Sequence, residues 1–256
     1  MQTKTLAAAL TAALAPASSA HEFWLRPNTF TPEPNQVISL QTFNGERFAG
    51  DALPRNNAHI ARFELLAPDG TAGRVFGRHG APNSLARPAT PGTHRAIYES
   101  VENPLVLEPA PFEAYLQEEG LAHIIERRAE LGESDQPGRE VYVRCAKALV
   151  SAGGGPPADL PTGLPLEIVL TEIEDGRVRA DVLFQDEPIA GLRVVAVSEG
   201  RPESMTELRS DRDGAVSFTP DSGGVWMLTT IHMTRLEDRD DADWKSYWAS
   251  TTFRLP

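Results

Sequence analysis

The first histidine of this chain stands where it can become an amino-terminal metal ligand. Residues 1–20 have the pattern of a secretory leader: a positive start at Lys4, a short apolar segment, and small residues before a cleavage site after Ala20. Cleavage there makes His21 the first residue of the mature protein. Its α-amine and its ring Nδ1 then form a chelating pair of the kind that copper and nickel favour. The alternative is that His21 merely follows the cleavage site and has no role.

His232 is the best candidate for a second metal ligand. It lies in an apolar run that predicts a strand, on the same face as Trp226 and Leu228. Two imidazoles and one amine would give three nitrogen donors in a T shape, as in copper proteins with a histidine brace. A histidine on an apolar face is otherwise a core residue that is hydrogen-bonded to the backbone, and this alternative stays open. Three further features could join the site: His59, His94 and the acidic residues 237–243.

The overall charge excludes several classes of function. The chain has 24 Lys and Arg against 36 Asp and Glu, a formal net charge of −12. Such a balance argues against binding to nucleic acid or to an anionic membrane surface, and it suits a protein that attracts cations. No later run reaches the about 20 apolar residues that span a bilayer. We therefore expect a protein that is exported and released.

Cys145 is the only cysteine, so no disulfide can form within the chain. It ends the run Val141-Tyr142-Val143-Arg144-Cys145, in which apolar residues alternate with others. This period of two predicts a strand with the thiol on its apolar face. A buried, inert thiol is the expected state, and a copper ligand or a reactive thiol is the alternative.

The rest of the pattern predicts a mainly β fold. With 21 Pro and 20 Gly, the chain consists largely of short apolar runs between turn signals such as Asp213-Gly214. This rhythm predicts two β-sandwich domains of the immunoglobulin-like or transthyretin-like type. The expected strands are residues 37–43, 60–66 and 96–98 in the first half, and 166–171, 178–184, 192–197, 215–218, 225–233 and 247–255 in the second.

A Gly- and Pro-rich segment divides the chain into two predicted domains. Residues 151–159 include Gly153-Gly154-Gly155-Pro156-Pro157 and read as an exposed linker between domains at 21–150 and 160–256. One segment of the first domain, about 111–132, has helical spacing and predicts an α-helical insertion that bends near Gly120. We expect its His123 to be exposed, and His79 to lie in a loop.

Several motifs resemble a known family. The mature start His21-Glu22-Phe23-Trp24-Leu25-Arg26-Pro27 is similar to the opening of an uncharacterised family of bacterial periplasmic proteins that has carried a nickel-uptake label. The resemblance implies a periplasmic protein, and possible partnership with a membrane metal transporter. Residues 187–194 and 210–214 are also similar to transthyretin-like modules, which implies a fold and not a function. Further matches to the family are residues 112–116, 144–149, 163–167 and 243–250.

Three functions remain after these exclusions. The leading one is a non-enzymatic, periplasmic protein that binds copper or nickel through His21 and His232, for uptake or handling of the metal. The second is a binding module for a partner protein or a glycan, in which Trp24, Trp226, Trp244 and Trp248 either form a sugar platform or cap the cores. The third is a copper oxidase. The chain has no phosphate loop, Ser-His-Asp order or Cys-x-x-Cys pair, so we expect no enzyme.

Overall fold

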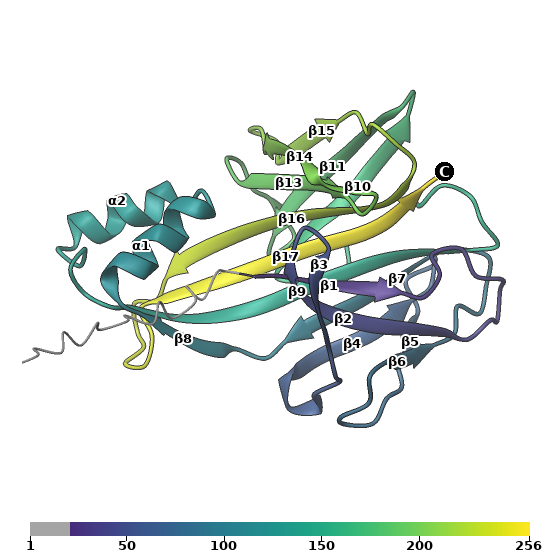
Figure 1. The fold of residues 1–256 in the computed structure, drawn as a ribbon, viewed down its shortest axis with the longest axis horizontal. Helices are drawn as coiled ribbons and strands as arrows, with labels where there is room; N and C mark the ends of the chain where they lie inside the picture. The colour runs from purple at the N-terminus through teal and green to yellow at the C-terminus, as the bar shows by residue number, and fades with distance from the viewer. Residues whose placement is uncertain (1–20) are drawn as a thin grey trace, which may run out of the picture.

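The structure, a computed structural model, describes residues 21–256, and the predicted leader at residues 1–20 lies outside the described residues. The chain is mainly β, as predicted. A nine-stranded sheet crosses the whole molecule (Figure 1). In spatial order its strands are β14 (Arg201–Arg209), β13 (Arg193–Ser198), β16 (Gly224–Arg235), β17 (Trp244–Leu255), β9 (Gly138–Ala152), β7 (Gly92–Ser100), β4 (Ile60–Leu66) and β5 (Ala72–Arg74), with β8 (Asn103–Leu107) also paired to β9.

Two four-stranded sheets pack on this large sheet. The first contains β1 (Glu22–Pro27), β2 (Ile38–Glu46), β3 (Ala49–Leu53) and β6 (Ser84–Ala86). The second contains β10 (Leu166–Glu174), β11 (Arg177–Phe184), β12 (Glu187–Pro188) and β15 (Ala215–Phe218). All nine predicted strands are confirmed, because alternating apolar residues and turn signals mark them locally.

The two small sheets cover opposite faces of the large one. On one face Cys145 and Ala249 join a core with residues of β10 and β11, such as Ile168. The neighbouring residue of β17, Ser250, points the other way, and its hydroxyl contacts strand β1. Because side chains alternate along a strand, these contacts place the first small sheet and the second on opposite sides.

Strands β9 and β17 join the two predicted domains. They pair in parallel, from Glu140 beside Trp244 to Ala148 beside Thr252, so strands from both halves of the chain belong to one sheet. The predicted linker at 151–159 is exposed at residues 153–156, but its first two residues end β9. The division of the chain into domains at 21–150 and 160–256 stays a prediction.

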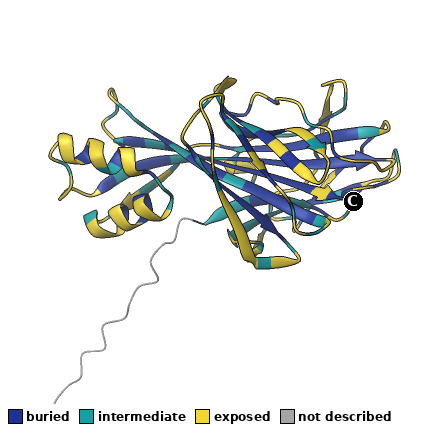
Figure 2. Ribbon diagram, turned by 90° about the horizontal axis from the view of Figure 1, so that it is seen from above, coloured by how far each residue is buried: buried dark blue, intermediate teal, exposed yellow. Residues whose placement is uncertain are grey.

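The strands in the middle of the large sheet are buried because the small sheets cover both of its faces. A strand that is covered on both faces needs a continuous run of small or apolar residues, and the second half of β9, from Cys145 to Ala152, is buried at every position. Figure 2 shows the same long buried strands in the middle of the molecule and exposed residues on its periphery.

The predicted helical insertion is confirmed. It consists of α1 (Pro109–Glu118) and α2 (Ala122–Glu130), separated at Gly120, whose φ of 72° favours glycine. Both helices lie over one end of the large sheet (Figure 1). Their apolar side chains pack there against Trp244 and Trp248. A short 3-10 helix, η1 (Asn57–His59), precedes β4. Among residues 21–256, no helix is both long and apolar enough to cross a membrane.

Candidate functional site

Strand β1, which begins one residue after His21, is fixed on the large sheet by side-chain donors. The Ser250 hydroxyl donates to the carbonyl of Phe23, and the Thr252 hydroxyl donates to the carbonyl of Leu25, both at 2.7 Å. Small hydroxyl residues on this face of β17 let the backbone of β1 approach closely and satisfy its carbonyl groups. The sheet therefore sets the position of the predicted mature amino terminus.

His21 faces two carboxylates across the first small sheet. The register of β1, β2 and β3 places Phe23 opposite Asn44, and Asn44 opposite Asp51. One step further along, His21 comes opposite Glu46. Side chains two residues apart share a face, so all four polar side chains are on one side of this sheet. They line an open depression of about 630 Å³.

The turn beside His21 has an unusual backbone. Arg47 and Phe48 connect β2 to β3 and both have positive φ, at 49° and 66°. Hairpin turns of this shape normally use Asn or Gly, and other residues cost about 1 kcal/mol each. Two contacts hold the turn in place: the Arg47 amide donates to the Glu22 carboxylate at 2.7 Å, and the Phe48 ring packs edge-on against Trp24.

Glu22 also opens into a second, more enclosed space. This cavity of about 280 Å³ lies between β1, α1, β13 and β17, and Glu22, Glu119, Arg193 and Trp248 are among its lining residues. Burial raises the pKa of both carboxyls to about 7. Arg193 lies 3.8 Å from Glu119 and opposes this increase. The cavity therefore holds two carboxyls that exchange protons near neutral pH.

Arg144 lies beneath the same amino terminus. Its guanidinium donates to the carbonyl of His21 at 2.7 Å and lies 4.4 Å from the Trp248 ring and 4.9 Å from the Tyr142 ring. No ion pair joins it to a carboxylate within residues 21–256, and burial lowers the pKa of Arg144. Arg144 is thus a half-buried cation held mainly by aromatic rings and a carbonyl group.

Glu140 is a third carboxyl with a raised pKa. It is buried on β9 and accepts hydrogen bonds from the Tyr115 hydroxyl at 3.4 Å and from the Ser246 hydroxyl. Burial is the largest cause that raises its pKa to about 7. Its second oxygen has no hydrogen-bond partner among the described residues, which favours the protonated form further.

The structure does not bring His232 to His21. The His232 ring lies 4.5 Å from Phe184 of β11, on the face of the large sheet that the second small sheet covers. Strand β1 lies on the opposite face. The other neighbour of His232 is His123, with ring centroids 6.4 Å apart, and burial lowers the pKa of His232 to about 4.

The remaining candidates are dispersed. His59 ends η1, His94 is buried in β7, and His79 lies in an exposed loop and accepts a hydrogen bond from the Asn57 amide. In the acidic segment 237–243, carboxylates pair with Arg139 and Arg239. Across residues 21–256 there is no cluster of three or more His, Cys, Asp or Glu side chains suited to a metal ion.

The expected state of Cys145 is confirmed. The thiol is buried in β9, and burial raises its pKa to about 12. The four tryptophans are buried as well, each at 8% exposure or less, so they cap cores and form no exposed sugar platform: Trp24, Trp226, Trp244 and Trp248.

Sequence reasoning missed the charged residues that surround the amino terminus. Glu119 follows α1, Arg193 begins β13, and Arg144 lies in the middle of β9, so only the fold brings them together. One signal was present for Arg144, because a cation between apolar residues of a strand needs a partner inside the protein.

Comparisons with known proteins give a family and no activity. A family model described as a domain of unknown function (DUF4198) matches residues 18–234, and this description names no ligand. A search of the curated proteins finds no match. Two solved structures show distant similarity, and their TM-scores carry no argument.

The first of these structures is a tetra-tandem repeat in the extending region of a large adhesion protein, with 8% identity and a TM-score of 0.22 over 91% of this chain. This chain spans about half of that one, 49% of its length. The second is the D0-D1 domain of intimin, with 10% identity and a TM-score of 0.24, covering 91% of this chain and 97% of that chain.

Proposed function

We propose that this chain, which belongs to the DUF4198 family of domains of unknown function, is an exported protein that binds copper(II) or nickel(II) through its mature amino terminus. Cleavage after Ala20 frees the α-amine of His21, and the amine and the ring Nδ1 chelate the metal. The protein then keeps the ion or passes it to a membrane metal transporter from the periplasm.

The position of His21 carries this proposal. Its carbonyl is held by Arg144, and the strand that follows it is held by β17, so little backbone freedom is lost when a metal binds. Glu46 and Asp51 line the same depression and add negative charge beside the two nitrogens, which favours a cation there. His232 has no part in the proposed site, because it lies on the other face of the large sheet.

The test is calorimetry with copper(II) and nickel(II) on three secreted proteins: the native start, a start with one alanine added before His21, and Asp51→Asn. The added residue converts the amine to an amide and should weaken binding at least tenfold. Because an α-amine has a pKa of about 7.7–8.0, native binding should tighten from pH 6 to pH 8. Equal affinity for the native and the extended start would refute the proposal.

The enclosed cavity favours a second candidate function, a binding module for a small cationic organic ligand. Glu22 and Glu119 supply negative charge as they lose protons near pH 7, and Trp248 supplies an apolar wall. Glu119→Gln separates the two functions, since it should abolish binding of such a ligand and leave metal affinity at His21 unchanged.

We also propose that the fold consists of two β-sandwiches that share the nine-stranded sheet.

A further inference from the structure

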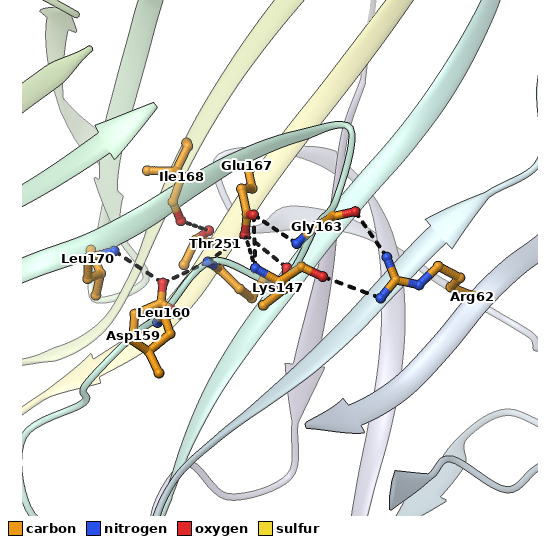
Figure 3. Close-up of polar contacts among 10 residues, drawn as sticks. Arg62, Lys147, Asp159, Leu160, Gly163, Glu167, Ile168, Leu170 and Thr251 are labelled. Carbon is orange, nitrogen blue, oxygen red and sulfur yellow. Dashed lines mark hydrogen bonds and ion pairs between the residues drawn. The ribbon is translucent and has the colours of Figure 1, made fainter. Parts of the chain in front are cut away.

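A buried lysine meets two buried carboxyls where the two halves of the chain join. Lys147 of β9 is fully buried, and its Nζ lies 2.7 Å from Oδ2 of Asp159 and 3.3 Å from Oε2 of Glu167. The two carboxyl side chains are 0% and 1% exposed. Figure 3 shows the three side chains converging from β9, from the segment after it, and from β10.

Backbone amides hold the Asp159 carboxyl in one orientation. The Leu160 amide donates to Oδ1 at 2.8 Å, and the Leu170 amide donates to Oδ2 at 3.1 Å (Figure 3). Two donors on one carboxyl group draw electron density from its carbon, and they are placed to stabilise negative charge that develops on its oxygens. This carboxyl is therefore oriented and polarised for attack by a neighbouring nucleophile.

Glu167 is held by a different set of donors. The Thr162 amide and hydroxyl each approach it at 2.9 Å, and the Gly163 amide at 3.2 Å. These bonds fix the Glu167 carboxyl beside Nζ of Lys147, within reach of a proton on that nitrogen. Outside the cluster, Arg62 donates to the carbonyls of Thr162 and Gly163 and fixes the loop that carries them (Figure 3).

Burial favours a protonated Asp159. It raises the pKa of this carboxyl, although the lysine and the hydrogen bonds from the Leu160 and Leu170 amides oppose this change. Within this fully buried cluster, transfer of a proton from Nζ of Lys147 to the carboxylate gives a neutral amine and a neutral acid. A neutral amine is a nucleophile, and a neutral acid has a hydroxyl that can leave.

We propose that Lys147 and Asp159 condense into an intramolecular amide bond after folding, with Glu167 as the proton relay. The lone pair of Nζ attacks Cγ of Asp159, and Glu167 accepts a proton from the nitrogen. Glu167 returns this proton to the departing hydroxyl, which leaves as water. One C–N bond forms, one C–O bond breaks, no electron is transferred, and Glu167 ends in its starting state. The reaction needs no cofactor, and the inference is independent of the proposed metal site.

The test begins with the intact mass of the purified, unmodified protein under denaturing conditions. The mass should be lower than the sequence requires by one water molecule. Trypsin gives a second readout, because the next basic residue after Lys147 is Arg177. An amidated Lys147 resists cleavage, so residues 145–177 should remain one peptide, lighter by one water. Without the bond, trypsin releases residues 145–147 and 148–177 separately.

Variants assign the reaction to these side chains. Glu167→Gln cannot accept the proton and should restore the full mass and the cleavage at Lys147. Glu140→Gln is the matched control, a buried carboxyl on the same strand without contact to Lys147, and it should keep the lower mass. Loss of water as a succinimide at Asp175-Gly176 would leave Lys147 open to trypsin, which separates that reaction from this one.

A full mass for the unmodified protein, with cleavage at Lys147, would overturn the proposal without any variant. A lower mass that persists in folded Glu167→Gln would overturn the role of Glu167.

Discussion

Two basic side chains on the same strand, Lys147 fully buried and Arg144 half-buried, have opposite surroundings. Lys147 and Arg144 lie three residues apart on β9 and face opposite sides of the large sheet. Lys147 has two carboxyls within 3.3 Å. Arg144 has a carbonyl group and two aromatic rings, and no ion pair among the residues that the structure describes.

The surroundings of the two side chains indicate different roles. Lys147 takes part in holding the fold together, whereas the charged groups near Arg144 are accessible to a ligand. Around Lys147 the two carboxyls contact the lysine and nearby amide donors, and all three side chains are buried, so none of them is exposed to a ligand from outside. Near Arg144 the carboxyls of Glu22 and Glu119 line a cavity instead of pairing with it. The face of the sheet that carries strand β1 therefore retains charge that a ligand can use, and the other face uses its charge to join the two halves of the chain.

The largest expected effect concerns the shared sheet. A fragment of residues 160–256 lacks β9, which pairs with β17 and supplies Val143, Cys145 and Leu149 to the common core. We expect this fragment to show no cooperative thermal transition, because its longest strand loses a partner and its core is exposed. Circular dichroism during heating measures this. A sharp transition would instead support two independently folding domains, and it would contradict the role of the shared sheet in joining the two halves of the chain.

The next effect compares the two cations directly. Lys147→Met removes the side chain that joins the buried carboxyls of Asp159 and Glu167 to β9 and should lower the free energy of unfolding by about 3–5 kcal/mol. Arg144→Met loses one hydrogen bond and two ring contacts and should lower it by about 1–2 kcal/mol. Urea unfolding of both variants at pH 7 measures the difference. Equal losses would show that the two cations have the same structural role.

A pH dependence follows from the carboxyls on the Arg144 side. The pKa of Glu140 is about 7 in the folded protein against 4.5 as its ordinary value. Between these values the folded state holds a proton that the unfolded state releases, so stability falls as the pH rises from 4.5 to 7. Glu140→Gln should remove about 1–3 kcal/mol of this decrease. Unfolding free energies at pH 5 and pH 8 test it, and parallel profiles for the two proteins would contradict it.

The smallest effect concerns the strand that carries His21. Thr252→Val keeps the shape of the side chain and removes the hydroxyl that donates to the carbonyl of Leu25. The loss should be about 1 kcal/mol in unfolding free energy, because the carbonyl remains buried without that donor. Thr234→Val is a control, since its hydroxyl makes only a long bond of 3.5 Å on the same sheet. An equal loss in both variants would remove Thr252 from the anchor of β1.

Local signals predicted much of the fold. Alternation and turn residues located β4 and β11 within one residue of their bounds, and helical spacing located α1 and α2 with the break at Gly120. The pairing of β9 with β17 was not predictable in this way. An apolar run indicates that a strand is buried on both faces, but it carries no information about which distant strand lies beside it.

The candidate site was predictable only at its first residue. The small residues before His21 marked the predicted mature amino terminus from sequence alone. The chain reaches Glu46 and Asp51 through a hairpin whose turn residues, Arg47 and Phe48, give no hairpin signal. His232 was chosen for its apolar strand, and its position on that strand places it beside Phe184, on the face of the large sheet opposite to β1.

The single buried thiol, Cys145, can be used to measure how often the large sheet opens. Cys145 lies on β9, the strand that both halves share, and its pKa of about 12 leaves almost no thiolate at neutral pH. An alkylating reagent can therefore reach it only when β9 separates from the layer above it. The rate at which Cys145 is labelled therefore measures how frequently β9 separates, and the unmodified protein needs no introduced probe. A covalent bond from Lys147, close to the thiol, to the following segment would lower the labelling rate of Cys145.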